Sequence, residues 1–278
     1  MKFDGETDRV IRVALAEDLG PDGLDVTTVA TIPADQTDVA ELVARADGVV
    51  AGLGVAAAVF EAVGPVRVTQ LVADGDRVLE GTVLATISGP TRTLLTAERT
   101  ALNLLCRMSG IATHTRAWVD ALEGTGAHVL DTRKTTSGLR ALEKYAVRAG
   151  GGTNKRMGLY DVAMIKDNHK LAAGSVAEAY ARVRTAFPEV DIQVEVTTVD
   201  EVREALAAGA TFLLCDNMTP DLLREVVMVV DGRAELEATG GLTLDRVLEY
   251  AKTGVDYLSV GALTHSSPIM DIALDLRR

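Results

Sequence analysis

The stretch IQVEVTTVDEVREALAAGATFLLCD, residues 192–216, decides the fold class of this chain. It begins with an apolar run at 192–196, continues with helical spacing of apolar residues at 200–208, and ends with a second run at 212–216. A strand, a helix and another strand in direct succession are typical of the βα repeat that builds parallel sheets. The chain is therefore predicted to be an α/β protein.

The same pattern extends in both directions from this stretch. Helix-like segments separate further β-rich runs, most of which end on a polar or glycine residue. The further runs lie at 128–131, 162–166, 234–238 and 257–261, and the further helices at 175–187, 220–230 and 244–253. Six clear strands are fewer than the eight of a closed barrel, so we expect an open or incomplete α/β barrel of six or seven strands. A doubly wound sheet is the alternative, because its ligands also bind at strand carboxyl ends.

The first part of the chain has a different pattern. Residues 39–45 and 66–72 alternate between apolar and polar side chains, as half-buried strands do. Asp74-Gly75 and Glu80-Gly81 supply turns between further strands. These features predict a separate α+β region. Two helices, at 95–108 and 111–122, are expected to follow it, separated at Ser109-Gly110.

Composition and charge exclude several classes of protein. The chain has 278 residues, 47% of them hydrophobic, so it can bury a large core. Its formal net charge of -12 argues against a surface for nucleic acid or for an anionic membrane, since either needs a basic face. No apolar run approaches the roughly 20 residues of a membrane helix. The start lacks an apolar signal core, and Cys106 and Cys215 stand alone in hydrophobic runs, so we expect a cytoplasmic protein with reduced thiols.

Positive charge is nevertheless concentrated in one segment. Residues 131–170 carry the bases Arg133, Lys134, Arg140, Lys144, Arg148, Lys155, Arg156, Lys166 and Lys170, against the acids Asp131, Glu143, Asp161 and Asp167. Ion pairing on a helix face explains Arg140, Lys144 and Arg148 in part. It does not explain the bases that stand beside glycines or at strand ends.

Three of these basic sites stand at successive strand ends or glycine turns. Asp131-Thr132-Arg133-Lys134 leaves the first barrel strand, the triple glycine at 150–152 leads to Asn154-Lys155-Arg156, and Lys166 ends the next strand. Arginine can bind a carboxylate or phosphate through two parallel hydrogen bonds, and lysine adds a point charge. A solvated basic turn would explain any one of the three. Their coincidence favours a binding site for an anion.

Acidic and glycine-bearing strand ends complete the candidate site. Glu195 and Asp216 lie on neighbouring runs, and Mg²⁺ is commonly held by one or two carboxylates together with substrate phosphates. Carboxylates that only balance nearby lysines are the alternative, and the sequence leaves both open. Thr239-Gly240-Gly241 and Val260-Gly261-Ala262 follow the last two runs, where backbone N–H groups can bind phosphate.

Taken together, these motifs make the chain resemble the quinolinate phosphoribosyltransferase family, whose members are also called carboxylating nicotinate-nucleotide pyrophosphorylases. The resemblance runs nearly from end to end. It rests on TAERTALN at 96–103, the basic stretch at 131–134, LEKYAVR at 142–148, IKDNH at 165–169 and TGVDY at 253–257.

The resemblance implies a two-domain subunit. An N-terminal α/β sandwich domain would cover residues 1–107, with 270–278 packing back onto it, and the open α/β barrel would cover 108–269. It also implies a homodimer, or a higher oligomer built from it, in which Arg99 reaches the active site of the neighbouring subunit.

The implied reaction transfers the phosphoribosyl group of phosphoribosyl pyrophosphate (PRPP) to quinolinate with loss of CO₂, a step of NAD biosynthesis that yields nicotinate mononucleotide and pyrophosphate. Lys134, Glu195 and Asp216 are the implied catalytic residues, and Mg²⁺ is the implied cofactor, held by Glu195 and Asp216 with the substrate phosphates. The implied substrate-binding residues are Arg99, Thr132, Arg133, Lys134, Lys155, Arg156, Lys166, Glu195, Asp216, Thr239, Gly240, Gly241, Val260, Gly261 and Ala262.

One position departs from the family's pattern. Asn154-Lys155-Arg156 stands where the family usually has Asn-His-Arg, so Lys155 keeps a cation but changes its reach and hydrogen bonding. Two other functions therefore stay open: a relative that phosphoribosylates or binds a related aromatic acid, and a non-catalytic sensor of PRPP or a nucleotide. Intact Lys134, Glu195 and Asp216 favour the enzyme over the sensor.

Overall fold

The computed structural model describes residues 5–277 of the chain. Two compact units make up the protein: the first consists of Met1–Arg116, Thr135–Gly151 and Leu263–Arg278, and the second of Ala117–Lys134 and Gly152–Ala262. Residues 1–4 and 278, which the predicted sandwich domain includes, lie outside the described residues. The domain limits drawn from the resemblance stay a prediction.

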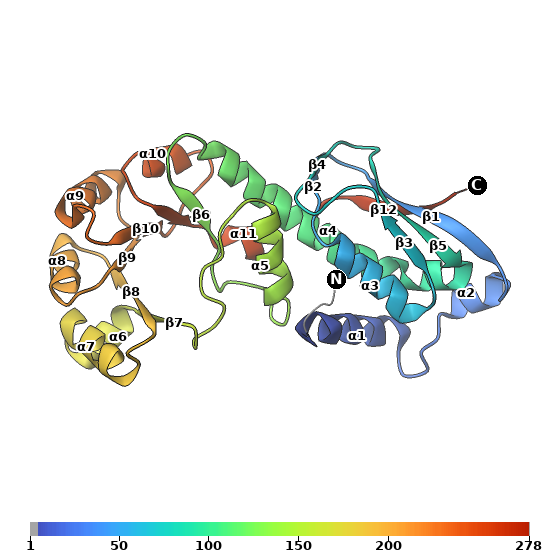
Figure 1. Cartoon of the computed structure of the whole chain (residues 1–278), viewed down its shortest axis with the longest axis horizontal. Coiled ribbons are helices and arrows are strands. Elements are labelled where there is room, and N and C mark those ends of the chain that lie inside the picture. Colours follow the sequence, from blue (N-terminus) through green and yellow to red (C-terminus); the bar gives the residue numbers. More distant parts are fainter. Residues whose placement is uncertain (1–4, 278) are drawn as a thin grey trace. The chain divides into compact units, whose positions relative to one another are not determined.

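A six-stranded parallel sheet forms the centre of the second unit (Figure 1). Its strands follow the order β6-β11-β10-β9-β8-β7, and every neighbouring pair is parallel. β6 and β7 are the two edge strands and do not pair with each other among the described residues, so the sheet is an open barrel, as predicted. The six strands are β6 (His128–Leu130), β7 (Val162–Ile165), β8 (Asp191–Val196), β9 (Phe212–Asp216), β10 (Glu235–Thr239) and β11 (Tyr257–Ser259).

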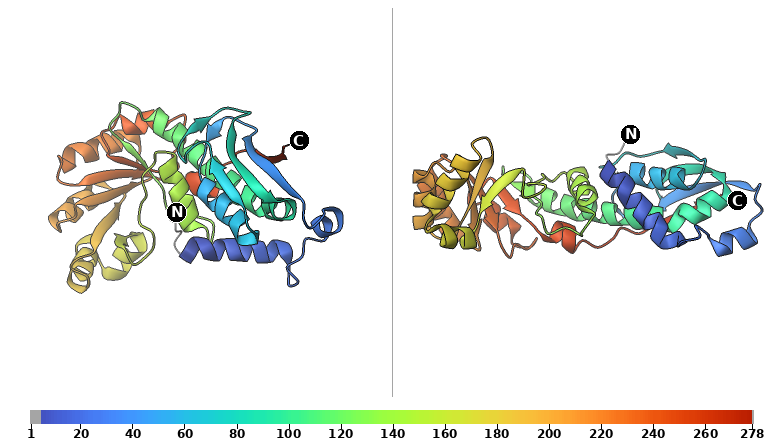
Figure 2. Two further views of the ribbon diagram at one scale, coloured as in Figure 1. Left: turned by 45° about the vertical axis from the view of Figure 1, so that its right-hand side comes forward. Right: turned by 90° about the horizontal axis from the view of Figure 1, so that it is seen from below.

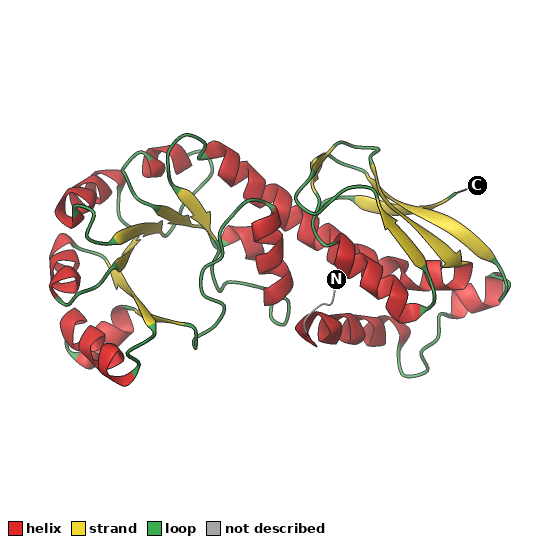
Figure 3. Ribbon diagram, in the orientation of Figure 1, coloured by secondary structure: helices red, strands yellow, loops and turns green. Residues whose placement is uncertain are grey.

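Helices alternate with these strands and lie along the outer side of the sheet (Figure 3). They are α6 (Asp167–Ala173), α7 (Val176–Ala186), α8 (Val199–Ala207), α9 (Pro220–Val230) and α10 (Val247–Ala251). Ser175, Thr198 and Thr219 each cap a helix start, because each side-chain oxygen accepts a hydrogen bond from the backbone N–H three residues later. These caps fix where each strand-to-helix loop ends.

The two faces of the sheet differ in polarity. Side chains alternate between the faces of a strand, so residues paired in register share a face. Val194, Leu213 and Leu236 form a buried apolar row on one face. On the other face, the rows near the carboxyl ends contain first Glu195, Leu214 and Glu237, and then Asp216, Thr239, Ser259 and Leu130. Polar side chains therefore collect on one face at one end of the sheet.

The first unit contains an antiparallel sheet, as the alternating pattern of its sequence predicts (Figure 2). The strands follow the order β12-β1-β5-β3, and a two-stranded ribbon pairs β2 with β4. The strands are β1 (Thr37–Ala44), β2 (Gly48–Val49), β3 (Arg67–Gln70), β4 (Arg77–Val78), β5 (Val83–Pro90) and β12 (Ile272–Leu276). The remaining helices are α1 (Gly5–Leu19), α2 (Val26–Thr31), α3 (Leu53–Val63), α4 (Thr91–Ala121), α5 (Arg140–Ala149) and α11 (Ala262–His265).

Helix α4 is continuous, so the predicted break at Ser109-Gly110 is wrong. Ser109 and Gly110 are instead contact points for other segments. The Ser109 hydroxyl accepts from Ala51 N at 3.0 Å and lies 3.2 Å from Ala51 O. A Cβ on Gly110 would lie 2.0 Å from the backbone oxygen of Pro268. Small residues in this helix therefore allow close approach, and packing outweighs their low helix propensity. Neither α4 nor any other described helix is both long and apolar enough to cross a membrane.

Candidate active site

The end of β6 is tied to the segment that carries the second basic site. Asp131 is fully buried, and its carboxylate accepts from Asn154 Nδ2 at 2.6 Å and from Lys155 N at 2.7 Å. The backbone adds two bonds, from Asp131 N to Thr153 O and from Thr153 N to Val129 O. These hydrogen bonds hold the segment Asn154-Lys155-Arg156 beside the carboxyl end of β6.

Lys155 forms an ion pair inside the barrel. Its Nζ lies 2.5 Å from Oε1 of Glu237 on β10, and the two side chains are 7% and 0% exposed. Burial lowers the pKa of Lys155, while the adjacent Glu237 carboxylate acts in the opposite direction. The structure therefore places this cation in the polar row of the sheet, paired with a carboxylate that the sequence did not single out.

Arg133 and Arg156 are near enough for their positive charges to interact. Arg156 donates from Nη1 to Val162 O at 3.0 Å. Burial, followed by the positive charge of Arg133, lowers the pKa of Arg156. Arg133 Nε is buried and has no hydrogen-bond partner among the described residues. An anion would suit this place. A carboxylate or phosphate would neutralise the two positive charges and accept a hydrogen bond from Arg133 Nε.

Lys166 directly follows β7 and faces the neighbouring strand β8. Its Nζ lies 3.5 Å from Glu195 Oε2, and its side chain is 49% exposed. Its backbone N–H donates to His169 Nδ1 at 3.0 Å, so His169 stabilises the start of α6. Lys166 therefore remains accessible, while His169 has a local structural role.

Asp216 and the loop after β10 occupy the next polar row. Asp216 and Thr239 are in register, and Asn217 N donates to Thr239 O at 2.9 Å. Gly240 has a φ of +95°, and a Cβ there would lie 2.2 Å from Asn217 Oδ1, so only glycine fits the loop. The Ser259 hydroxyl in the same row is buried without a partner among the described residues. This row therefore places the side-chain oxygens of Asp216, Thr239 and Ser259 next to the tight turn at Gly240.

The chain matches two family models along most of its length. The N-terminal domain of quinolinate phosphoribosyl transferase matches residues 25–109, and the C-terminal domain matches residues 111–275. The chain belongs to the quinolinate phosphoribosyltransferase family. The resemblance seen in the sequence motifs is thereby confirmed.

Members of this family from several bacteria are similar to this chain over most or all of their length. The carboxylating nicotinate-nucleotide pyrophosphorylase of Mycobacterium leprae is 51% identical, with 99% of this chain and 98% of that protein aligned. The probable enzyme of the same name from Bacillus subtilis is 44% identical, with 94% and 90% aligned. The crystal structure of NadC from Streptococcus pyogenes superposes with a TM-score of 0.94 at 37% identity, covering 100% of both chains.

Most of the predicted site residues of this phosphoribosyltransferase lie at one end of the second unit. The barrel strands or the loops that follow them carry Thr132, Arg133, Lys134, Lys155, Arg156, Lys166, Glu195, Asp216, Thr239, Gly240, Gly241, Val260, Gly261 and Ala262. Lys134 is exposed, and its backbone N–H donates to Thr132 Oγ1 at 3.0 Å. Arg99 lies apart from this group in sequence, on an exposed face of α4 in the first unit.

Glu195 and Asp216 fit a metal only with help from a substrate. Both lie on the same face of adjacent strands, but no cluster of three or more potential metal ligands occurs among residues 5–277. Two carboxylates supply fewer oxygens than Mg²⁺ requires, and the usual remedy is coordination by substrate phosphates and water. The donor set is therefore compatible with a metal that arrives with a polyphosphate.

Sequence reasoning missed two residues that shape the site, Glu237 and Asp131. Asp131 belongs to the basic stretch at 131–134, where its neighbours suggest anion binding, but its buried carboxylate holds the Lys155 backbone. Glu237 alternates with Glu235 in the run at 234–238, so the sequence does not show that Glu237 is the buried one of the two. A buried carboxylate in a strand requires a partner, but only the fold identifies Lys155.

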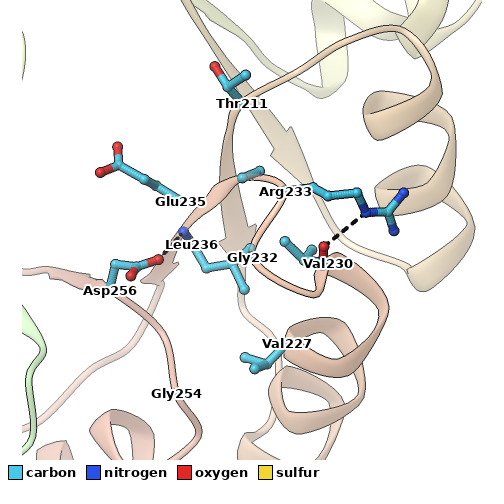
Figure 4. A pocket seen from close by; sticks show the side chains of 10 residues that line it. Thr211, Val227, Val230, Gly232, Arg233, Glu235, Leu236, Gly254 and Asp256 are labelled. Carbon is cyan, nitrogen blue, oxygen red and sulfur yellow. Dashed lines mark hydrogen bonds between the residues drawn. The ribbon is translucent and has the colours of Figure 1, made fainter.

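A separate hollow lies at the opposite end of β10 (Figure 4). It measures about 340 Å³ and is lined by Thr211, Val227, Val230, Gly232, Arg233, Ala234, Glu235, Leu236, Gly254 and Asp256. Its polar groups already serve the fold, since Arg233 Nε donates to Val230 O and Leu236 N donates to Asp256 Oδ2. In α/β barrels this amino end contributes stability, and the carboxyl end carries the chemistry.

Proposed function

We propose that this protein transfers the phosphoribosyl group of PRPP to quinolinate and releases nicotinate mononucleotide, pyrophosphate and CO₂, as a pentosyltransferase of NAD biosynthesis. The observation that carries the proposal is the group of cations Arg133, Arg156 and Lys166 beside the carboxylates Glu195 and Asp216. The full-length similarity to relatives named for this reaction supports it.

The cations at the ends of β6 and β7 are suited to the acid substrate. We propose that Arg133, Arg156 and Lys166 bind the two carboxylates of quinolinate, with Thr132 and Lys155 in the same part of the site. Arg156 and Arg133 repel each other, so a dianion between them would relieve that repulsion. Arg99 would complete the site from the neighbouring subunit of a homodimer or of a larger assembly built from dimers.

The ends of the inner strands β8 to β11 are suited to PRPP. We propose that the backbone of Thr239-Gly240-Gly241 and of Val260-Gly261-Ala262 binds the 5′-phosphate, as glycine turns do elsewhere. Lys134 would neutralise the pyrophosphate, and Glu195 and Asp216 would bind the ribose hydroxyls and hold Mg²⁺. When bound, Mg²⁺ supplies positive charge that stabilises the departing pyrophosphate.

The chemistry needs positioning and charge more than a nucleophilic side chain. The pyridine nitrogen forms a bond to the ribose carbon as the bond to pyrophosphate breaks, and pyrophosphate leaves with the electron pair. Glu195 and Asp216 would stabilise the positive charge that develops on the ribose in between. The carboxylate next to the quaternised nitrogen then leaves as CO₂, the ring accepts its electron pair, and the vacated carbon takes up a proton.

The test is an assay of purified protein with PRPP and Mg²⁺, offered quinolinate, nicotinate and substituted pyridine acids in parallel. We expect nicotinate mononucleotide and CO₂ in equal amounts from quinolinate, and no product when Mg²⁺ is chelated. Matched variants Glu195→Gln and Asp216→Asn should lower kcat by on the order of 100-fold without unfolding the protein. Binding of PRPP without turnover of any acid would instead support a sensor.

A related acid is the second candidate, and Lys155 is the observation that favours it. Its ammonium is committed to Glu237, so the site differs there from one with a histidine. Turnover of another pyridine acid at a higher kcat/KM than quinolinate would establish this alternative. We further propose that the protein acts in the cytoplasm.

A further inference from the structure

Lys155 and Lys166, the two lysines in the part of the site proposed to bind the substrate acid, differ in burial and in their partners. Lys166 is 49% exposed and lies 3.5 Å from Glu195, whereas Lys155 is 7% exposed and lies 2.5 Å from Glu237. Glu237 is fully buried, and its second oxygen has no hydrogen-bond partner among residues 5–277. A buried carboxylate is costly without a counter-charge, so the Lys155 ammonium is the group that makes Glu237 tolerable.

Lys155 is held at its backbone as well as at its ammonium. Asp131 accepts from Lys155 N at 2.7 Å, and Glu237 Oε1 contacts Lys155 Nζ at 2.5 Å. A substrate carboxylate that took this ammonium would leave Glu237 buried without its counter-charge. This exchange would form an ion pair between Lys155 and the substrate and break the ion pair between Lys155 and Glu237. It would therefore contribute little to the affinity for the substrate.

We propose that Glu237 is a specificity-determining positioning residue, whose carboxylate cancels the charge of Lys155 and leaves recognition of the acid to the more open cations. This inference rests on the proposed function and deepens it. Arg133, Arg156 and Lys166 then carry the charge that selects an acid, and the Lys155–Glu237 pair forms a neutral part of the wall. The site therefore selects a dianion with one positive charge fewer than its basic residues suggest.

The charges around Lys155 are consistent with an ion pair that has no net charge. Burial lowers the pKa of Lys155, and the positive charges of Arg156 and Lys166 act in the same direction. Glu237 is the group that opposes them.

A double-mutant cycle tests the proposal through the Kd of quinolinate, measured by titration calorimetry at pH 8. Lys155→Met should weaken quinolinate binding by about tenfold or more, because it leaves the negative charge of Glu237 next to the site. Adding Glu237→Gln should recover most of that loss and bring the Kd to within about threefold of the wild-type value. Nicotinate, with one carboxylate, should show a smaller effect than quinolinate in both variants.

Glu235→Gln on the same strand is the matched control, because Glu235 is exposed and its carboxylate accepts a hydrogen bond from the Tyr257 hydroxyl at 3.2 Å. It should leave the quinolinate Kd unchanged. A double variant that binds no tighter than Lys155→Met would overturn the proposal, since Lys155 would then be a direct ligand of the acid. If Lys155→Met does not fold, a double variant that folds but binds more than about threefold weaker than wild type has the same meaning.

This cycle also separates the inference from the proposed function. Wild-type protein that binds PRPP but no quinolinate would contradict the function before any variant is made. Wild-type binding of quinolinate together with an unrecovered double variant would contradict the inference alone.

Discussion

Single buried charges organise the candidate site. Asp131 and Glu237 are each 0% exposed, and they hold the backbone and the side chain of Lys155. Ionised groups in such positions are tolerated only when a counter-charge or several hydrogen bonds satisfy them. The cations that remain more accessible, such as Lys166, are the ones suited to bind substrate. Burial therefore separates residues that build the site from residues that meet the ligand.

The same reasoning predicts the effect of Lys155→His. An imidazole can still donate a hydrogen bond to Glu237, so kcat/KM for quinolinate should stay within about threefold of wild type or rise. Lys155→Ala is the control, because an unpaired Glu237 should destabilise the fold by about 3 kcal/mol or more. Steady-state kinetics with quinolinate and nicotinate, together with urea unfolding, measure both effects. A tenfold or larger fall in kcat/KM for the histidine variant would favour a different acid.

At the scale of elements, loops of the barrel depend on particular carboxylates. Asp161 accepts hydrogen bonds from Met157 N at 2.5 Å, Gly158 N at 3.1 Å and Val162 N at 3.1 Å. These bonds fix the turn between Arg156 and strand β7. Burial alone would raise the pKa of Asp161, but the backbone N–H donors outweigh it and lower the pKa below its ordinary 3.8.

Asp161→Asn should therefore destabilise the protein in a pH-dependent way. A carboxylate with a lowered pKa in the folded state stabilises the fold above its ordinary pKa of 3.8, and that contribution is lost as the pH falls through the lowered value. We expect a loss of roughly 1 kcal/mol at pH 6 that shrinks below about pH 4. Urea unfolding between pH 3 and pH 7 measures it. Asp221→Asn, at a carboxylate that is 95% exposed, should show little change.

Helix α4 gives the second prediction at this scale. A Cβ on Gly110 would meet Pro268 O at 2.0 Å and Ile269 Cα at 2.8 Å, both backbone atoms that cannot move aside easily. Gly110→Ala should therefore cost about 3 kcal/mol of unfolding free energy, although alanine favours helices. Gly5→Ala, at the start of α1 with nothing within 4 Å, is the matched control and should be neutral or slightly stabilising. Equal stability of the two variants would contradict the packing argument.

At the scale of the whole molecule, the sequence predicts repeating features better than contacts between distant residues. The six barrel strands were predictable because β-rich runs alternate with capped helices, and parallel strands must present their polar ends together. The Lys155–Glu237 ion pair was not predictable from the sequence, because its members are separated by 82 positions and no local pattern relates them. The continuity of α4 was missed for a similar reason, since Gly110 serves a contact with residues near 268.

A mixed dimer tests whether two subunits share each active site. Arg99 is exposed on α4, whereas Lys166 directly follows β7 in the other compact unit. If Arg99 completes the neighbouring subunit's site, Arg99→Ala and Lys166→Ala should each lower kcat by on the order of 100-fold as homodimers. Two differently tagged variants, co-expressed and purified as the heterodimer, should regain about half of the wild-type activity, because one of the two sites then carries both native residues. If Arg99 acted within its own chain, every site in the heterodimer would lack one residue, and no activity would return.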